Sequence, residues 1–174
     1  MISFEEIRVI TVVYLAVFLP LIIYFKNKEK LPNWIPTFYI VGVVVCSLGW
    51  ELWFSYGWIS GDGVDLRRSE SLNTWLPKDI NWLMNSMGDA GTVLLGGTWL
   101  MWVTHKKDQI VFKEWKWSGF CVLLTWCVTQ NILVEMFLYH DQLAEDKLLS
   151  WAPLSPFGPY FNPILFEYND RTIM

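Results

Sequence analysis

The sequence predicts an all-α integral membrane protein, a bundle of four transmembrane helices with both termini on the outer side and a non-helical C-terminal tail. Three observations lead to this class. Four apolar runs each approach or exceed the roughly 20 residues with which a helix crosses a bilayer; they cover residues 7–25, 35–58, 80–103 and 117–139. The chain is 53% hydrophobic and 17% charged, a composition of membrane type. Its 12 tryptophans are far above ordinary usage, and many lie near the ends of the runs, where indole rings favour the membrane interface.

Length and charge restrict the possibilities further. With 174 residues, we expect one membrane domain over residues 1–174. A net charge of -4 offers no basic surface for nucleic acid. The cysteines all fall inside apolar runs, so they are expected as small buried hydrophobic residues and not as metal ligands or disulfides. We therefore predict no metal site and no cofactor.

The first run, residues 7–25, is expected to be a permanent anchor. The N-terminal residues lack both a basic leader and a small-residue cleavage site, so no removable signal peptide is predicted. Lys26, Lys28 and Lys30 follow the run at once. The second run, residues 35–58, contains Glu51 and ends in a cluster of aromatic residues.

The segments that follow alternate between polar and apolar character. Residues 59–79 carry mixed charges with glycine and proline breakers, so one substantial loop is predicted there. The third run, 80–103, begins half polar and continues apolar, and a short lysine-rich connection at 105–116 leads into the fourth run, 117–139. The tail, residues 140–174, contains four prolines among aromatic residues and cannot form a regular spanning helix.

The two lysine-rich connections set the orientation. Residues 26–30 and 105–116 alternate correctly with the mixed or acidic segments, as the positive-inside rule predicts for four spans. Both connections are therefore placed in the cytoplasm, and the protein in the plasma membrane, or in the inner membrane if it is bacterial.

Three carboxylates lie inside apolar runs at similar predicted depth: Glu51, Asp89 and Glu135. Glu51 is about seven residues from the outer end of its run, or ~10 Å at the rise of an α-helix. Ionisable groups at membrane depth are costly unless they are paired or functional. We therefore treat these three as candidate catalytic residues.

Other polar residues share faces with the carboxylates at spacings of three or four. The stripes are Ser47, Glu51 and Ser55; Asn85, Asp89 and Thr92; and Cys127, Asn131 and Glu135. Facing lipid, such stripes would be unfavourable, so they are expected to enclose a pocket open to the outer side. The alternative is that these polar groups simply hydrogen-bond helices to one another.

Crowded carboxyl groups in an apolar site cannot all be ionised, and a neutral acid beside an ionised partner suits general acid and base chemistry. Trp50, Trp53 and Trp126 are close in sequence to the polar layer, and indole faces can stabilise a cation. Packing at the membrane interface is the alternative role of these rings. His140 either extends the site as a titrating group or lies at the water interface as a helix-end residue.

The pattern of Gly49-Trp50-Glu51 in one run, Asp89 ahead of Thr92 to Trp102 in the next, and Glu135 in the one after resembles the EXPERA group, which contains the emopamil-binding sterol isomerases. The resemblance covers roughly residues 40–140. It implies intramembrane carboxylates that shift a double bond by protonation and deprotonation inside an aromatic pocket. Glu51 and Asp89 would be the acid and base.

The leading hypothesis is a multi-pass protein that binds a terpenoid, sterol or carotenoid-like lipid and isomerises or cyclises it by proton transfer. Glu135 would tune the other carboxylates and Asn131 would orient a carboxylate or the ligand. The alternative is a non-catalytic lipid- or pigment-binding accessory subunit of a larger membrane complex, and proton relay or cation binding is a third possibility. Expected partners are a membrane lipid or apolar small molecule, and either a second copy or a membrane-complex subunit.

Overall fold

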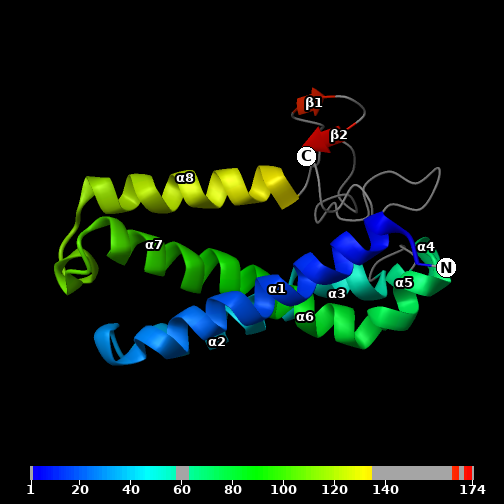
Figure 1. Ribbon diagram of the computed structural model, residues 1–174, viewed down its shortest axis with the longest axis horizontal. Coiled ribbons are helices and arrows are strands. Elements are labelled where there is room, and N and C mark those ends of the chain that lie inside the picture. The colour runs from blue at the N-terminus through cyan, green and yellow to red at the C-terminus, as the bar shows by residue number, and fades with distance from the viewer. Residues whose placement is uncertain (1, 58–62, 135–165, 169–170, 174) are drawn as a thin grey trace.

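A computed structural model describes residues 2–57, 63–134, 166–168 and 171–173, apart from the side chains of Trp53, Arg67 and the last six residues. The described chain is predominantly helical, which confirms the all-α class. Four helical columns run along the long axis (Figure 1). In chain order they are α1, α2 with α3, α6 with α7, and α8. Strands β1 (Phe166–Tyr168) and β2 (Arg171–Ile173) pair antiparallel.

Helix α1 (Phe4–Asn27) begins with a capping box. The Ser3 side chain accepts a hydrogen bond from the Glu6 backbone N–H, and the Glu6 carboxylate accepts one from the Ser3 backbone N–H at 2.7 Å. The side of α1 that carries Val9, Val13 and Val17 is buried. Helix α1 packs against α6, and it continues into the short 3₁₀ helix η1 (Lys28–Lys30).

The second predicted run is broken into α2 (Ile35–Leu48) and α3 (Trp50–Tyr56), which are bent by 40°. The prediction of one continuous stripe through Ser47, Glu51 and Ser55 is therefore wrong at Gly49. A Cβ at Gly49 would lie 2.7 Å from the Val45 carbonyl oxygen, so only glycine fits the break.

The prediction of a loop over residues 59–79 is also wrong in part. Helix α4 (Val64–Arg67) and helix α5 (Glu70–Trp75) form there. Ser69 caps α5 by accepting a hydrogen bond from the Leu72 backbone N–H at 3.2 Å. Leu72 and Leu76 are buried against α1, so this segment closes the N-terminal end of the bundle.

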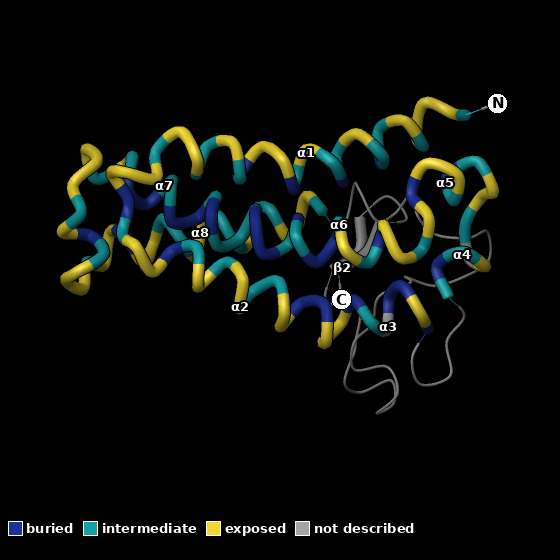
Figure 2. Tube along the Cα trace, turned by 90° about the horizontal axis from the view of Figure 1, so that it is seen from below, coloured by how far each residue is buried: buried dark blue, intermediate teal, exposed yellow. Residues whose placement is uncertain are grey.

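The third column is continuous but irregular. Helix α6 (Lys78–Ala90) passes into the π-helical segment η2 (Gly91–Gly96) and then into α7 (Gly97–Thr104). Buried residues concentrate on α6 and on the sides of its neighbours that face it, while exposed residues follow the outer sides of α1 and α2 (Figure 2). The column therefore forms the centre of the molecule.

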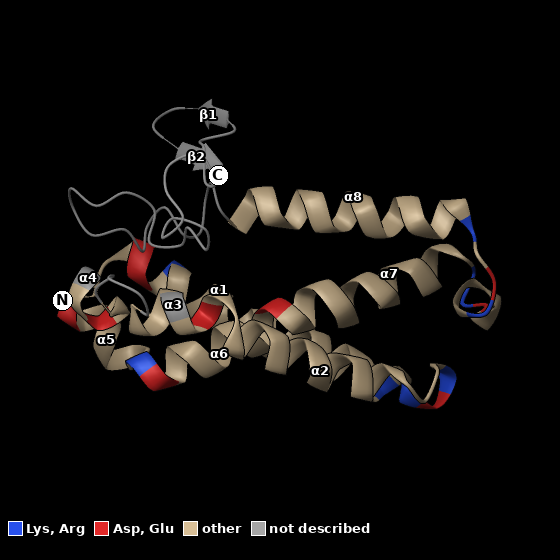
Figure 3. Ribbon diagram, turned by 180° about the vertical axis from the view of Figure 1, so that it is seen from behind, with Lys and Arg blue, Asp and Glu red and all other residues tan. Residues whose placement is uncertain are grey.

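Charges separate toward the two ends of the bundle (Figure 3). Lysines gather where α1 meets α2 and where α7 meets α8, a region that includes the 3₁₀ helix η3 (Gln109–Phe112). We call this the lysine end, and the opposite end, which carries Glu5 and Glu6, the N-terminal end. Helix α8 (Trp117–Leu133) packs mainly against α7 and runs back from the lysine end.

Within the described residues, one helix is long and apolar enough to cross a membrane, Phe4–Lys30. The bent pair α2 and α3 would be a second candidate if it forms one span, and α8 is a shorter apolar helix. Membrane insertion through the N-terminal helix is thus compatible with the structure.

Candidate functional site

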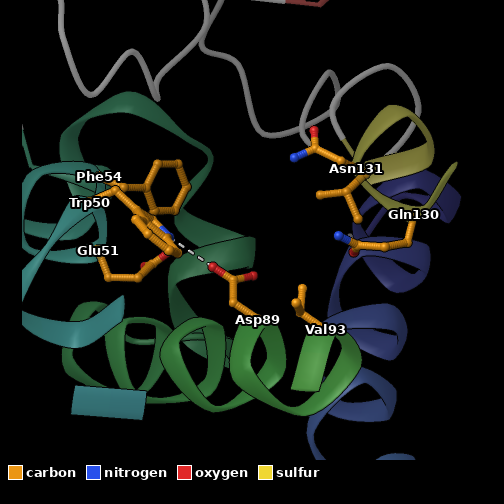
Figure 4. Close-up of a pocket in the computed structure, with 8 residues that line it drawn as sticks. Trp50, Glu51, Phe54, Asp89, Val93, Gln130 and Asn131 are labelled. Carbon is orange, nitrogen blue, oxygen red and sulfur yellow. Dashed lines mark hydrogen bonds between the residues drawn. The ribbon is translucent and has the colours of Figure 1, made fainter. Parts of the chain in front are cut away.

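A cavity of about 280 Å³ opens between α3, the α6 column and α8. Figure 4 shows its two sides. Carboxyl and aromatic groups come from α3 and α6, and carboxamides come from α8 on the opposite side. The lining residues are Trp50, Glu51, Phe54, Asp89, Val93, Gln130, Asn131 and Val134.

Glu51 is held in the first turn of α3, directly after the Gly49 break, and only 1% of its surface is exposed. The Ser55 hydroxyl, one turn further along α3, donates to Glu51 Oε2 at 3.5 Å. Asn85 of α6 lies beside the same carboxyl group. A carboxyl group buried this deeply requires hydrogen-bond partners or its own proton.

Asp89 lies in the last turn of α6, half-buried, with its carboxyl group toward the cavity. The Trp50 indole N–H donates to Asp89 Oδ2 at 2.8 Å, a bond that ties α3 to α6 across the cavity wall. Neither Glu51 nor Asp89 forms an ion pair with a lysine or arginine of the described chain. Among the described residues, the two carboxyl groups are therefore supported by hydrogen bonds and not by a cation.

Two further indoles stabilise the helix irregularities that shape the site. Trp82 donates to the Ser47 carbonyl oxygen at 2.8 Å, next to the α2–α3 break. Trp126 of α8 donates to the Thr92 carbonyl oxygen at 2.8 Å, inside the π-helical segment. Breaks and π-helical turns leave backbone carbonyls without regular partners, and these indoles satisfy them.

These contacts divide the predicted ligand-binding residues into groups. Trp50 and Asn131 line the cavity, and Ser55 and Asn85 contact Glu51 from behind it. Three other predicted residues do not line the cavity: Ser47, Thr92 and Trp126. Their polar groups donate hydrogen bonds to backbone carbonyl oxygens of the helices instead. Glu135, His140 and the side chain of Trp53 lie outside the described residues.

Four lining residues were missed: Phe54, Val93, Gln130 and Val134. Helical spacing could have found three of them, since Phe54 follows Glu51 by three residues, Val93 follows Asp89 by four, and Val134 follows Asn131 by three. The search for polar stripes passed over these apolar neighbours.

Chemically, the cavity combines two carboxyl groups with aromatic rings and two carboxamides. One carboxyl group can donate a proton while the other accepts one, and amides can orient an oxygen-containing or unsaturated ligand. Among the described residues, no three His, Cys, Asp or Glu side chains are grouped as metal ligands would be.

Comparison with models of known protein families gives no match, and comparisons with curated proteins and with solved structures give none either.

Proposed function

We propose that the protein crosses the membrane four times, with one span in each helical column. Large apolar side chains are exposed along the outer faces of the columns, where water would be unfavourable and lipid would not. These include Leu15, Phe18, Ile22, Ile40, Val44, Leu124 and Val128. The lysine end then lies in the cytoplasm and the N-terminal end outside, with both termini outside.

Within this bundle, we propose that the cavity binds a terpenoid, sterol or carotenoid-like lipid and isomerises or cyclises it by acid and base catalysis. One observation carries the proposal: Glu51 and Asp89 line one small cavity beside apolar and aromatic side chains, and neither is paired with a cation of the described chain. The volume of about 280 Å³ is near the lower end of small-molecule sites, which suits the unsaturated part of a lipid.

In the proposed reaction, Glu51 begins with its proton and transfers it to one carbon of a double bond. The cation that results is stabilised by the ring faces of Trp50 and Phe54. Asp89 then accepts a proton from a neighbouring carbon, which places the double bond at a new position. Gln130 and Asn131 orient the substrate, and Glu135 is assigned to tuning the other carboxyl groups.

The resemblance of Gly49-Trp50-Glu51, Asp89 and Glu135 to the EXPERA pattern supports the same chemistry. In that reading, Glu51 and Asp89 correspond to the acid and base of the sterol isomerases. The broken helix at Gly49 adds a structural reason for the first motif, because it fixes Glu51 in the first turn of a new helix.

The test is extraction of the protein from its native membrane in mild detergent, with mass spectrometry of the lipids and proteins that remain bound. Wild type is compared with Glu51→Gln and with Glu5→Gln, which alters an exposed carboxylate on α1. We expect a terpenoid-like lipid whose chemical form changes only in Glu51→Gln, because loss of a general acid typically slows a reaction by about 10²–10⁴-fold.

The second candidate, a non-catalytic accessory subunit of a membrane complex, is favoured by the exposed side of α8. An open, mostly apolar groove of about 440 Å³ lies there, lined by Leu100, Cys121, Val122, Thr125, Trp126 and Thr129. A stoichiometric protein partner in the same preparation, with no specific lipid, would replace the catalytic proposal with this one.

A further inference from the structure

Two amide groups on α6, those of Asn81 and Asn85, are buried with few hydrogen-bond partners for their nitrogen atoms among the described residues. Asn81 is fully buried and Asn85 is 5% exposed. Among the described residues, Asn81 Nδ2 makes no hydrogen bond. Asn85 Nδ2 makes none of good geometry, and its amide interacts with the Glu51 carboxyl group. Leaving a buried donor unsatisfied is unfavourable, and such groups in proteins are usually satisfied by an internal water molecule.

The two amides form a line. Their spacing of four residues places them on one face of α6, about 6 Å apart along the axis, with Asp89 one turn further on. Asn81 lies toward the N-terminal end, where its Oδ1 accepts a hydrogen bond from Arg68 Nη1 at 2.9 Å. This bond fixes the orientation of the Asn81 amide. Asn85 lies beside Glu51, so the line leads from Arg68 to the buried carboxyl group.

A third unsatisfied atom lies at the N-terminal end of the line. Asp65 Oδ2 pairs with Lys78 Nζ at 3.4 Å, but Asp65 Oδ1 is buried without a hydrogen bond in the described structure. A Cβ at Gly63 would lie 2.6 Å from this oxygen and 3.5 Å from the Ser55 carbonyl oxygen. Asp65 is therefore close to the backbone of Ser55, whose hydroxyl contacts Glu51.

We propose that water molecules bound by Asn81 and Asn85 form a file from the N-terminal end of the bundle to the Glu51 carboxyl group, and that Glu51 exchanges its proton through this file. None of Asn81, Asn85 or Asp65 lines the 280 Å³ cavity. The proposed file is thus separate from the space that a lipid would fill.

The role of the file in turnover rests on the proposed function. Each reaction cycle moves one proton from Glu51 to the substrate and one from the substrate to Asp89. Asp89 releases its proton when the product leaves the cavity, and Glu51 regains one from water through the file. Protons therefore balance over a cycle, and no other reactant is needed.

The test measures access of a water-sized, membrane-impermeant reagent to Glu51. In a background with Cys46→Ala, Cys121→Ala and Cys127→Ala, the substitution Ser55→Cys places a thiol next to Glu51. The purified chain in proteoliposomes is exposed to Ag⁺, and protection of the thiol from later alkylation is read by mass spectrometry. Ser86→Cys is the matched control, because Ser86 is equally buried on α6 and its hydroxyl is already bonded to the Trp82 carbonyl oxygen.

We expect Ser55→Cys to react and Ser86→Cys to stay unreactive. Filling the file with an apolar side chain of similar size, by Asn81→Leu or separately by Asn85→Leu, should slow the Ser55→Cys reaction by about tenfold or more. The corresponding change on the cavity side, Asn131→Leu, should leave the rate unchanged. Two independent blocking variants keep the test decisive if one of them fails to fold.

The proposal is overturned if Ser55→Cys is unreactive, if a folded blocking variant reacts as fast as the unblocked chain, or if only Asn131→Leu slows the reaction, which would assign access to the cavity. Reagent access does not depend on turnover. If Ser55→Cys reacts, the Asn→Leu variants slow that reaction, and no lipid is converted, then the water file is retained and the catalytic proposal is removed. The two proposals can therefore fail separately.

Discussion

At the scale of single residues, three tryptophan indoles supply hydrogen bonds to the polar groups in and around the site. The indoles of Trp50, Trp82 and Trp126 donate to a carboxylate, to a helix break and to a π-helical turn. The sequence suggests Trp50 and Trp126 as interface residues or cation stabilisers. Their structural contacts show that two of them hold the frame and one reaches the carboxyl pair.

Replacing Trp50 with Phe tests the contact to Asp89 while an aromatic ring is retained. The variant loses the 2.8 Å bond from the indole to Asp89 Oδ2. We expect a loss of about 1 kcal/mol in the free energy of unfolding, the net contribution of one hydrogen bond, since the half-buried Asp89 carboxyl group can be solvated in place of its lost donor. Thermal unfolding in detergent measures the loss. Trp75→Phe, which changes an indole that is 59% exposed, should shift the midpoint little, and equal shifts for both variants would show that the bond adds no stability.

At the scale of elements, the positions of the main helices followed from the apolar runs, and the described parts of all four runs are helical except at Gly49 and Gly57. Two features did not follow. At the Gly49 break there is no room for a Cβ beside the Val45 carbonyl oxygen, and the periodicity of the sequence does not reveal this close approach. Helices α4 and α5 were hidden because each is short, the segment mixes charged with apolar residues, and only a few apolar side chains, such as Leu72, are buried against α1. Of the lining residues that were missed, Phe54, Val93 and Val134 carry no polar group, and Gln130 is polar but lies outside the stripe through Cys127, Asn131 and Glu135.

Gly49→Ala tests the break. The new Cβ would lie 2.7 Å from the Val45 carbonyl oxygen, so α2 and α3 must shift and move Glu51. We expect destabilisation of about 1–3 kcal/mol, the range of an overpacked site, together with loss of lipid binding. Gly96→Ala is the control, because its Cβ would meet only ordinary contacts of 3.6 Å or more. An unfolding midpoint for Gly49→Ala at or above that of Gly96→Ala would refute the steric origin of the break.

The link between α1 and α5 makes a prediction about pH. Glu6 lies ahead of the apolar run, and hydrogen bonds from the hydroxyls of Ser69 and Ser71, then from the Ser3 backbone N–H, lower its pKa from 4.5 to about 2. A pKa lowered in the folded state means that the stabilisation is present above about pH 4.5 and is lost as the pH falls toward 2. Hydrogen exchange of residues 70–75 should therefore rise relative to a pH 6 reference as the pH falls below 4.5.

Intrinsic exchange changes with pH as well, so the comparison is made against Glu6→Gln at each pH. This variant keeps most of the side chain's shape but cannot gain or lose the proton. Its protection over residues 70–75 should be weaker at pH 6 and should vary less with pH than that of wild type. Parallel profiles for the two chains would mean that Glu6 does not couple α1 to α5.

At the scale of the whole molecule, the site and the topology support one interpretation. The cavity lies where α8 faces the α3 and α6 wall, on the half of the bundle away from the lysine end. If the lysine end is cytoplasmic, lipid enters from the outer half of the membrane and protons enter from the outer surface along α6. Exposed apolar faces then meet lipid, and the short helices α4 and α5 cover the outer end of the bundle.

This orientation makes a direct prediction for the two ends. In a chain without native cysteines, Glu70→Cys should react with a membrane-impermeant maleimide on intact cells, because α5 lies at the N-terminal end. Glu114→Cys, at the lysine end, should react only after the membrane is permeabilised. Both positions are solvent-exposed, so access of the reagent reports sidedness and not burial. The opposite pattern would show that the bundle has the inverse orientation. Reaction of both positions on intact cells would show that the column of α6 and α7, which connects them, does not cross the membrane.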